Sequence, residues 1–200
     1  MIADRPQLVV VGGPNGCGKT TFAKLYAQSQ GLTYLGADDI AMGLSPADPT
    51  LARIKAGREF SRCLSQRMDA RDSLVVESTL AGTSLAGTLA QAKADGYLVI
   101  IVVVFLDSVE LCLHRIAERV AQGGHDVPRQ DVMRRFRRVF PMFWSRYRPL
   151  ADRCLLVFNG GTAFSVVAEA NEQEWTIHDT GLWTTFQSFL RAESYESELR

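Results

Sequence analysis

A glycine-rich loop between an apolar run and a helical pattern restricts the possible folds of this chain more than any other feature. Residues 13–21 read Gly-Pro-Asn-Gly-Cys-Gly-Lys-Thr-Thr, which fits the pattern GxxxxGK[ST]. The run Leu8-Val9-Val10-Val11 precedes the loop, and residues 22–27 follow it with apolar side chains at helical spacing. A buried strand, a turn rich in glycine and a helix in this order predict a site for phosphate groups.

Each residue type in the loop has a chemical reason. Glycines let successive backbone N–H groups point into one concavity, and a helix starting near Lys19 adds the positive end of its dipole. Lys19 can reach the β- and γ-phosphates, and the Thr20 hydroxyl can bind Mg²⁺. We therefore expect ATP and Mg²⁺ as cofactors. The expected nucleotide-binding residues are Gly13, Pro14, Asn15, Gly16, Cys17, Gly18, Lys19, Thr20 and Thr21.

Short continuous apolar runs alternate with amphipathic segments along the chain. The runs are 8–11, 74–76, 98–106 and 154–158, with a weaker one at 33–36. Continuous apolarity suits strands that are buried on both faces. The pattern predicts an α/β fold of three layers, with a central parallel sheet of about five strands.

The end of the chain predicts a small accessory piece. Residues 164–168 and 175–177 can pair as a hairpin, and residues 182–190 can form a short helix. We expect one domain over residues 1–200, in which the accessory segment covers about 163–200.

Composition limits the partners of this chain. The 22 basic and 22 acidic residues cancel, which argues against binding nucleic acid through bulk charge. The four cysteines lack the spacing of a metal site, and without a signal peptide they read as reduced thiols. The longest apolar run is half the length of a membrane-spanning helix. We expect a cytoplasmic protein without membrane or nucleic-acid partners.

An acidic pair, Asp38-Asp39, directly follows the second predicted strand. Small kinases place there the acid that accepts the proton of the acceptor hydroxyl, facing the phosphate loop. We assign Asp38 as the catalytic base and as an acceptor-binding residue. The alternative is that the pair caps a short helix, which the apolar pattern of residues 40–44 predicts.

Other classes of phosphate-loop protein lack their signatures in this sequence. It has no LSGGQ-like segment of ABC-type ATPases and no NKxD motif of GTPases. It also lacks the far-downstream apolar run ending in Asp or Asp-Glu that motor and AAA-type proteins carry. The sequence favours a small kinase that phosphorylates a hydroxyl group. The alternative is an ATP-binding switch or slow ATPase that works through a protein partner.

The third predicted strand ends in Glu77-Ser78-Thr79. Carboxylates at this end of a strand lie where open α/β sheets bind ligands. Glu77 could orient Mg²⁺ through water, and we expect Glu77 and Thr79 to bind the acceptor. The alternative is a strand-end acid followed by a Ser/Thr helix cap.

An arginine-rich region predicts a closing lid at about residues 122–148. It follows the glycine joint Gly123-Gly124 and includes a helix starting near Pro128. Arginines there can stabilise charge on the transferred phosphoryl group. We expect Arg119 and Arg134 to act in catalysis and Arg135 in substrate binding. The alternatives are a solvated basic helix face or a nucleic-acid surface.

These segments together resemble the zeta toxin-like family of P-loop kinases, in its compact bacterial branch. The resemblance rests on residues 12–21, Ala37-Asp38, residues 77–80 and the stretch Gly-Gly-His-Asp-Val-Pro at 123–128, and it covers about residues 8–159. It implies an adenylate-kinase-like strand order and ATP-dependent phosphorylation of a hydroxyl, with Asp38 as the base.

The resemblance also bears on the acceptor and the partner. Studied toxins of the family phosphorylate UDP-N-acetylglucosamine and are silenced by a small antitoxin, so it implies a UDP-amino sugar and an antitoxin here. Ala81 stands where those toxins carry an arginine in the substrate site. This departure weakens the link to the UDP-amino sugar.

One cysteine lies inside the loop. Cys17 stands beside Lys19 and a helix start, which together favour a thiolate, so the sequence predicts a reactive thiol that ATP protects. The alternative is a small side chain that points into the core.

Overall fold

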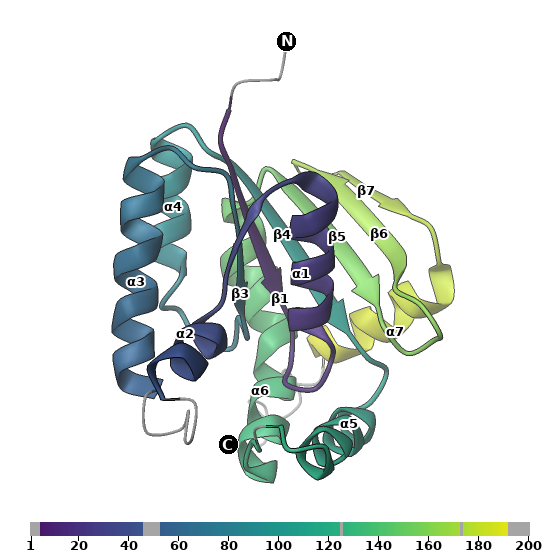
Figure 1. Cartoon of the computed structure of the whole chain (residues 1–200). Helices are drawn as coiled ribbons and strands as arrows, with labels where there is room; N and C mark the ends of the chain where they lie inside the picture. Colours follow the sequence, from purple (N-terminus) through teal and green to yellow (C-terminus); the bar gives the residue numbers. More distant parts are fainter. Residues whose placement is uncertain (1–4, 46–52, 125, 173, 192–200) are drawn as a thin grey trace, which may run out of the picture.

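The computed structural model describes residues 5–45, 53–124, 126–172 and 174–191 (Figure 1). Three acidic residues of the predicted accessory segment, Glu193, Glu196 and Glu198, lie outside the described residues, as does His125. Within the described part, helices cover both faces of one twisted sheet.

Five parallel strands form the larger part of the sheet. They are β1 (Gln7–Gly12), β2 (Thr33–Leu35), β3 (Leu74–Ser78), β4 (Leu98–Phe105) and β5 (Arg153–Phe158). Their order is β2-β3-β1-β4-β5, and every neighbouring pair among them is parallel. The predicted α/β fold is confirmed, in the strand order that the resemblance implied.

The C-terminal hairpin continues this sheet. Strands β6 (Ser165–Asn171) and β7 (Glu174–Ile177) are antiparallel, and β6 pairs with β5, so the sheet has seven strands and is mixed. The sequence predicted the hairpin but not its pairing with β5. The open edge of β5 explains the difference, because its unpaired backbone groups find partners in β6.

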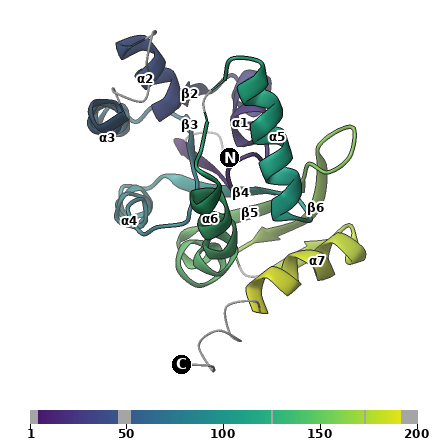
Figure 2. The same cartoon turned by 90° about the horizontal axis from the view of Figure 1, so that it is seen from below.

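The helices form two layers around the sheet (Figure 2). Their bounds are α1 (Lys19–Gln30), α2 (Ala37–Leu44), α3 (Arg53–Asp69), α4 (Ala86–Ala94), α5 (Val109–Ala121), α6 (Arg129–Met142) and α7 (Thr180–Arg191). A π-helical turn, η1 (Phe143–Tyr147), and a 3₁₀ turn, η2 (Arg148–Leu150), follow α6. Viewed from below, α1 covers one face of the sheet, whereas α4, α6 and α7 cover the other. Helix α3 stands beyond the β2–β3 edge, beside α4.

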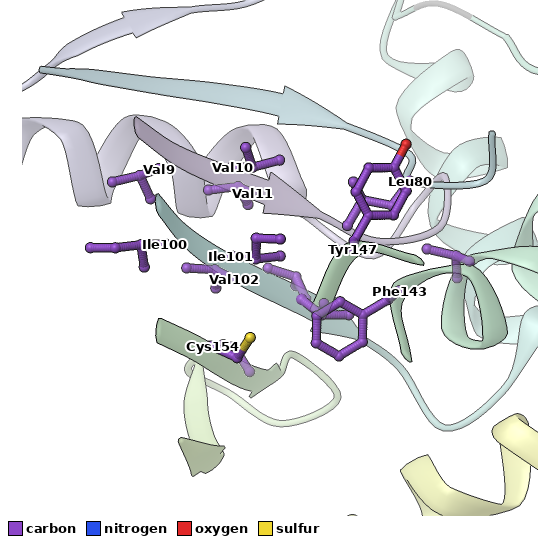
Figure 3. Packing of buried hydrophobic residues seen from close by; sticks show 14 of the residues in the cluster. Val9, Val10, Val11, Leu80, Ile100, Ile101, Val102, Phe143, Tyr147 and Cys154 are labelled. Atoms are coloured by element: carbon purple, nitrogen blue, oxygen red, sulfur yellow. The ribbon is translucent and has the colours of Figure 1, made fainter. Parts of the chain in front are cut away.

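The core lies along the central strands (Figure 3). The side chains of Val9, Val11, Ile101 and Val102 are fully buried, and η1 contributes the buried ring of Phe143. Helices on both faces explain why these strands are continuously apolar rather than alternating. Among the described residues, no helix is long and apolar enough to cross a membrane.

The fold gathers its polar loops at one end. The parallel strands all point toward the lower end of Figure 1, where α5 and the start of α6 lie. The phosphate loop follows β1, the acidic pair follows β2 and the Glu-Ser-Thr segment ends β3. Because carboxyl ends of parallel strands meet at one edge, segments far apart in sequence share one site.

Candidate active site

The glycine-rich loop adopts backbone angles that require glycine. Gly16 and Gly18 have φ angles of 82° and 94°, in the left-handed region. A Cβ on Gly16 would collide with the carbonyl oxygen of Cys112, and a Cβ on Gly18 would collide with the side-chain amide of Asn159. Neighbouring elements therefore press closely on this loop and hold its shape.

Two hydrogen bonds fix the loop and its lysine. Lys19 Nζ donates to the carbonyl oxygen of Pro14 at 2.8 Å, so the ammonium group lies back over the loop. Asn159 Nδ2, at the end of β5, donates to the carbonyl oxygen of Cys17 at 2.9 Å. Helix α1 begins at Lys19, and its first N–H groups face the same side. The loop thus presents a cation and a helix N-terminus to one anion.

A carboxylate from β3 joins the loop to β2. Thr20 Oγ1 donates to Glu77 Oε2 at 2.8 Å, and the Tyr34 hydroxyl donates to Glu77 Oε1 at 2.9 Å. Burial and the negative charge of Glu77 raise the pKa of Tyr34, so its hydroxyl stays protonated and acts as a donor. The Tyr34 hydroxyl occupies the space where a Cβ on Gly36 would stand, so only glycine there leaves room for this contact.

The acidic pair divides between two environments. Asp38 and Asp39 lie in the first turn of α2, whose N-cap is Gly36 without a side-chain cap. Asp39 forms an exposed ion pair with Lys24 at 2.8 Å. Asp38 instead lines the cavity above the phosphate loop. Neither aspartate is the N-cap, so capping does not account for the pair.

Arginines from α5 and α6 form the opposite wall. Arg115, Arg119 and Arg135 line the cavity. Arg135 Nη1 donates to Asn15 Oδ1 at 3.0 Å, which links α6 to the phosphate loop. Arg115 Nη2 donates to the carbonyl oxygen of Asn159 at 2.8 Å.

The other predicted arginine of α6 is not brought to the site. Arg134 pairs with Asp131 at 2.8 Å, its side chain is 59% exposed, and it does not line the cavity. Successive residues of a helix point about 100° apart. In this structure only Arg135 of the two lines the cavity, which favours Arg135 over Arg134 as the arginine that reaches the loop.

These groups surround one cavity of about 740 Å³. Most predicted site residues line it, whereas Gly13, Pro14 and Cys17 do not. The predicted residues that line it are Asn15, Gly16, Gly18, Lys19, Thr20, Thr21, Asp38, Glu77, Thr79, Arg119 and Arg135. Cations from the loop and two helices thus line the same space as the carboxylates of Asp38 and Glu77.

The structure contradicts the predicted reactivity of Cys17. Its side chain is fully buried, and burial raises the pKa of the Cys17 thiol, although Lys19 acts in the opposite direction. The sulfur lies in the core, which is the alternative that the sequence left open for Cys17. Desolvation of a thiolate there outweighs the nearby positive charge.

Three residues around the site were not singled out from the sequence. Tyr34 holds Glu77, Asn159 holds the loop, and Arg115 lines the cavity. Asn159 directly follows the run 154–158, so its place at a strand end was an available signal. The sequence around Tyr34 gave no such signal, because the contact of Tyr34 with Glu77 depends on the pairing of β2 with β3.

The donors around Thr20 suit a hard cation. The Thr20 hydroxyl and the Glu77 carboxylate offer oxygen ligands beside the phosphate loop, and Mg²⁺ binds through such oxygens together with nucleotide phosphates. Among the described residues, no group of three or more His, Cys, Asp or Glu side chains could hold a metal ion by itself. This arrangement fits Mg²⁺ that arrives with a nucleotide.

Comparison with solved structures shows which folds are similar. A chain of the AvrRxo1-ORF1–ORF2 complex with ATP has a TM-score of 0.73 and 18% identity, covering 94% of this chain and 65% of that chain. A chain of the PezAT chromosomal toxin–antitoxin system of Streptococcus pneumoniae has a TM-score of 0.60 and 13% identity, covering 95% of this chain and 88% of that chain. The zeta toxin-like P-loop kinase fold predicted from the sequence is thus confirmed. The chain spans less than two thirds of the AvrRxo1 chain.

Two curated proteins are similar in sequence. An uncharacterized protein of Haemophilus influenzae is 33% identical over 124 residues, which are 62% of this chain and 88% of that protein. A cytidylate kinase of Halobacterium salinarum is 32% identical over 122 residues, which are 56% of this chain and 58% of that protein. This chain therefore spans little more than half of the cytidylate kinase.

The sequence model of the family AAA_33, described as "AAA domain", matches residues 8–142. This corrects the expectation that the chain is not AAA-type, which rested on a missing acidic run far downstream. In the structure an acid is the penultimate residue of the apolar strand β3, since Glu77 precedes Ser78 and contacts Thr20. The match covers more than half of the sequence, so the chain belongs to the AAA_33 family of AAA domains.

Proposed function

We propose that this protein is an ATP-dependent kinase that transfers the γ-phosphoryl group to a hydroxyl of a small molecule. One observation carries the proposal. The phosphate loop with Lys19 and Thr20, the carboxylate of Asp38 and the guanidinium of Arg135 line a single cavity. A nucleotide-binding switch needs the loop, but it does not need an acid such as Asp38 on the wall of the same cavity.

The loop side would bind the nucleotide. Backbone N–H groups of the loop and the start of α1 would hold the β-phosphate, and Lys19 would leave Pro14 to reach the γ-phosphate. Thr20 and Glu77 would hold Mg²⁺, which neutralises charge between the phosphates. The crystallised AvrRxo1 complex with ATP supports ATP as the nucleotide.

The acceptor side would supply the base. Asp38 would accept the proton as the acceptor oxygen forms its bond to the γ-phosphorus, and the bond to the bridging oxygen of ADP would break. Base catalysis of this kind contributes about 10²–10⁴-fold to the rate. Glu77 and Thr79 lie beside Asp38 on the cavity wall and would orient the acceptor.

The arginine wall would close over the phosphates from α5 and the first turns of α6. It lies at the start of the region predicted as a lid, about residues 122–148, whose end belongs to the core with buried Phe143. Arg119 and Arg135 would stabilise the charge on the transferred phosphoryl group and exclude water. The hydrogen bond from Arg135 to Asn15 shows that α6 already reaches the loop. Arg134, which faces Asp131, would play no part.

We also propose that a protein partner regulates this kinase. The PezAT neighbour comes from a toxin–antitoxin system, and the AvrRxo1 neighbour was crystallised in a two-protein complex, which supports a small protein antitoxin here. The corresponding test is growth of a bacterial host. Expression of the wild type should slow growth, and expression of the Lys19→Ala variant should not.

The kinase proposal is tested with the purified protein and a bacterial metabolite extract. With Mg²⁺-ATP, mass spectrometry should find small molecules that have gained one phosphate group, at the expense of ATP. Formation of ADP and inorganic phosphate alone, whether or not the extract is added, would favour the ATPase or switch instead.

A further inference from the structure

A second cavity adjoins the phosphate site. It measures about 480 Å³ and lies in the groove between α3 and α4, which stand side by side in Figure 1. Glu77 and Ser78 line both cavities, so the two spaces are adjacent at the end of β3. A volume of this order is typical of small-molecule sites.

Each helix lines the groove with one face. On α3 the positions recur at intervals of three and four, from Gly57 through Ser61 and Ser65 to Asp69, and on α4 they run from Leu85 through Thr88 to Asp95. One face of each helix therefore lines this space without filling it. The groove leads from Glu77 at the phosphate site to the C-terminal ends of both helices.

The lining of the groove differs in charge from that of the phosphate site. It carries the carboxylates of Asp69, Glu77 and Asp95, together with several hydroxyls. Among the described residues that line it, none is Lys, Arg or His. The phosphate cavity by contrast has four basic side chains, namely Lys19, Arg115, Arg119 and Arg135.

We propose that this groove binds the phosphate acceptor, and that the acceptor is an alcohol without phosphate groups, either neutral or positively charged. The inference rests on the proposed kinase function and adds the class of substrate. Hydroxyls of Ser61, Ser65 and Thr88 would bind the polar edge of the acceptor. Its reacting hydroxyl would lie at the Glu77 end, beside Asp38.

A phosphorylated acceptor meets two obstacles in this groove. Its charge would face carboxylates, and like charges opposite one another at a binding surface weaken binding. Among the described residues, no Lys, Arg or His side chain of the groove would pair with its phosphate, although arginine and lysine are the side chains that usually recognise this group. Position 81, shortly after β3, is Ala81 and therefore supplies no arginine that could bind the phosphate of an acceptor. A UDP-amino sugar therefore does not suit the groove.

The test separates a bacterial metabolite extract on an anion-exchange resin at neutral pH. Both fractions are incubated with the full-length protein, Mg²⁺ and [γ-³²P]ATP. Label should enter small molecules of the unbound fraction, which holds neutral and cationic metabolites. Label confined to the bound fraction would overturn the inference while leaving the kinase proposal standing. Label in neither fraction would overturn both.

A matched pair of variants tests the groove itself. Thr88→Arg places a bulky cation in the groove, whereas Ala90→Arg places one on an exposed part of the same helix. Thr88→Arg should reduce labelling at least about tenfold with unchanged ATP affinity, and Ala90→Arg should not. Ser65→Arg, at a solvent-exposed position of α3 that also lines the groove, applies the same test if Thr88→Arg melts early. Full labelling by a folded groove variant would contradict this site.

Discussion

Thr20 and Glu77 stand 57 residues apart in the chain, yet Thr20 Oγ1 donates a 2.8 Å hydrogen bond to Glu77 Oε2. The contact joins the phosphate loop after β1 to the end of β3, because β1 and β3 are neighbouring parallel strands. It places a hydroxyl and a carboxylate where a cation bound to nucleotide phosphates would lie.

Replacing the loop lysine should reduce turnover without unfolding the protein. Lys19→Ala removes the cation nearest the phosphates, and loss of one such group lowers kcat by about 10²–10³-fold. Lys24→Ala is the control, since Lys24 lies on the same helix and pairs with exposed Asp39. Phosphoryl transfer and thermal melts are measured for both. Equal activity of the two variants would contradict the role of Lys19.

The two neighbouring arginines of α6 should differ. Arg135→Ala removes the cavity-lining guanidinium that contacts Asn15 and should reduce transfer by about 10²-fold. Arg134→Ala breaks only an exposed pair with Asp131, worth at most about 1 kcal/mol, and should retain the wild-type rate. Steady-state kinetics with saturating ATP decide this. A stronger loss in Arg134→Ala would place the lid differently from the structure.

Removing the Tyr34 hydroxyl should affect both stability and magnesium use. Tyr34→Phe deletes one hydrogen bond to the Glu77 carboxylate, which costs about 1–2 kcal/mol in unfolding free energy. Because Glu77 then loses one of its two restraints, the variant should need more Mg²⁺ for half-maximal rate. Denaturant unfolding and a Mg²⁺ titration measure the two effects. An unchanged Mg²⁺ requirement would mean that Tyr34 contributes to the stability of the protein but not to its use of Mg²⁺.

The same tyrosine predicts a pH effect on stability. The pKa of Tyr34 is raised in the folded protein, so the folded state holds this proton at higher pH than the unfolded state does. Its contribution to stability is full below about pH 10 and decreases as pH rises further. The stability difference between wild type and Tyr34→Phe should shrink over that range. A constant difference would show that the hydroxyl ionises equally in both states.

Thiol labelling should follow burial rather than proximity to the loop. Burial raises the pKa of Cys17 and raises the pKa of Cys112 and Cys154 to about 12, so all three stay protonated at neutral pH. Cys63 is only partly buried and should alkylate first. Peptide mapping after brief alkylation shows the order. Rapid labelling of Cys17 in the folded protein would mean that the loop opens.

Local patterns in the sequence predicted most of the fold. Continuous apolar runs predicted five parallel strands, because burial on both faces leaves that signature in each strand. The pairing of β6 with β5 was not predicted, since it depends on which edge of the sheet is free.

The candidate site was predictable where one short segment carries the chemistry. The phosphate loop and Asp38 follow strands directly, so their place was evident. The contact of Tyr34 with Glu77 and the choice between Arg134 and Arg135 depend on distant pairing and helix rotation. The burial of Cys17 likewise follows from packing against β4 and α5, which its neighbours in the sequence do not reveal.

Phosphoryl transfer by the Asp38→Asn variant tests the central claim most directly, with Asp39→Asn as its control. Asp38 lines the cavity, whereas the neighbouring Asp39 pairs with Lys24 at the surface. Asp38→Asn should bind ATP normally and lose about 10²–10⁴-fold in transfer of ³²P from ATP to small molecules, and Asp39→Asn should retain the wild-type rate. Undiminished transfer by Asp38→Asn would contradict the assignment of this acid as the base of a kinase.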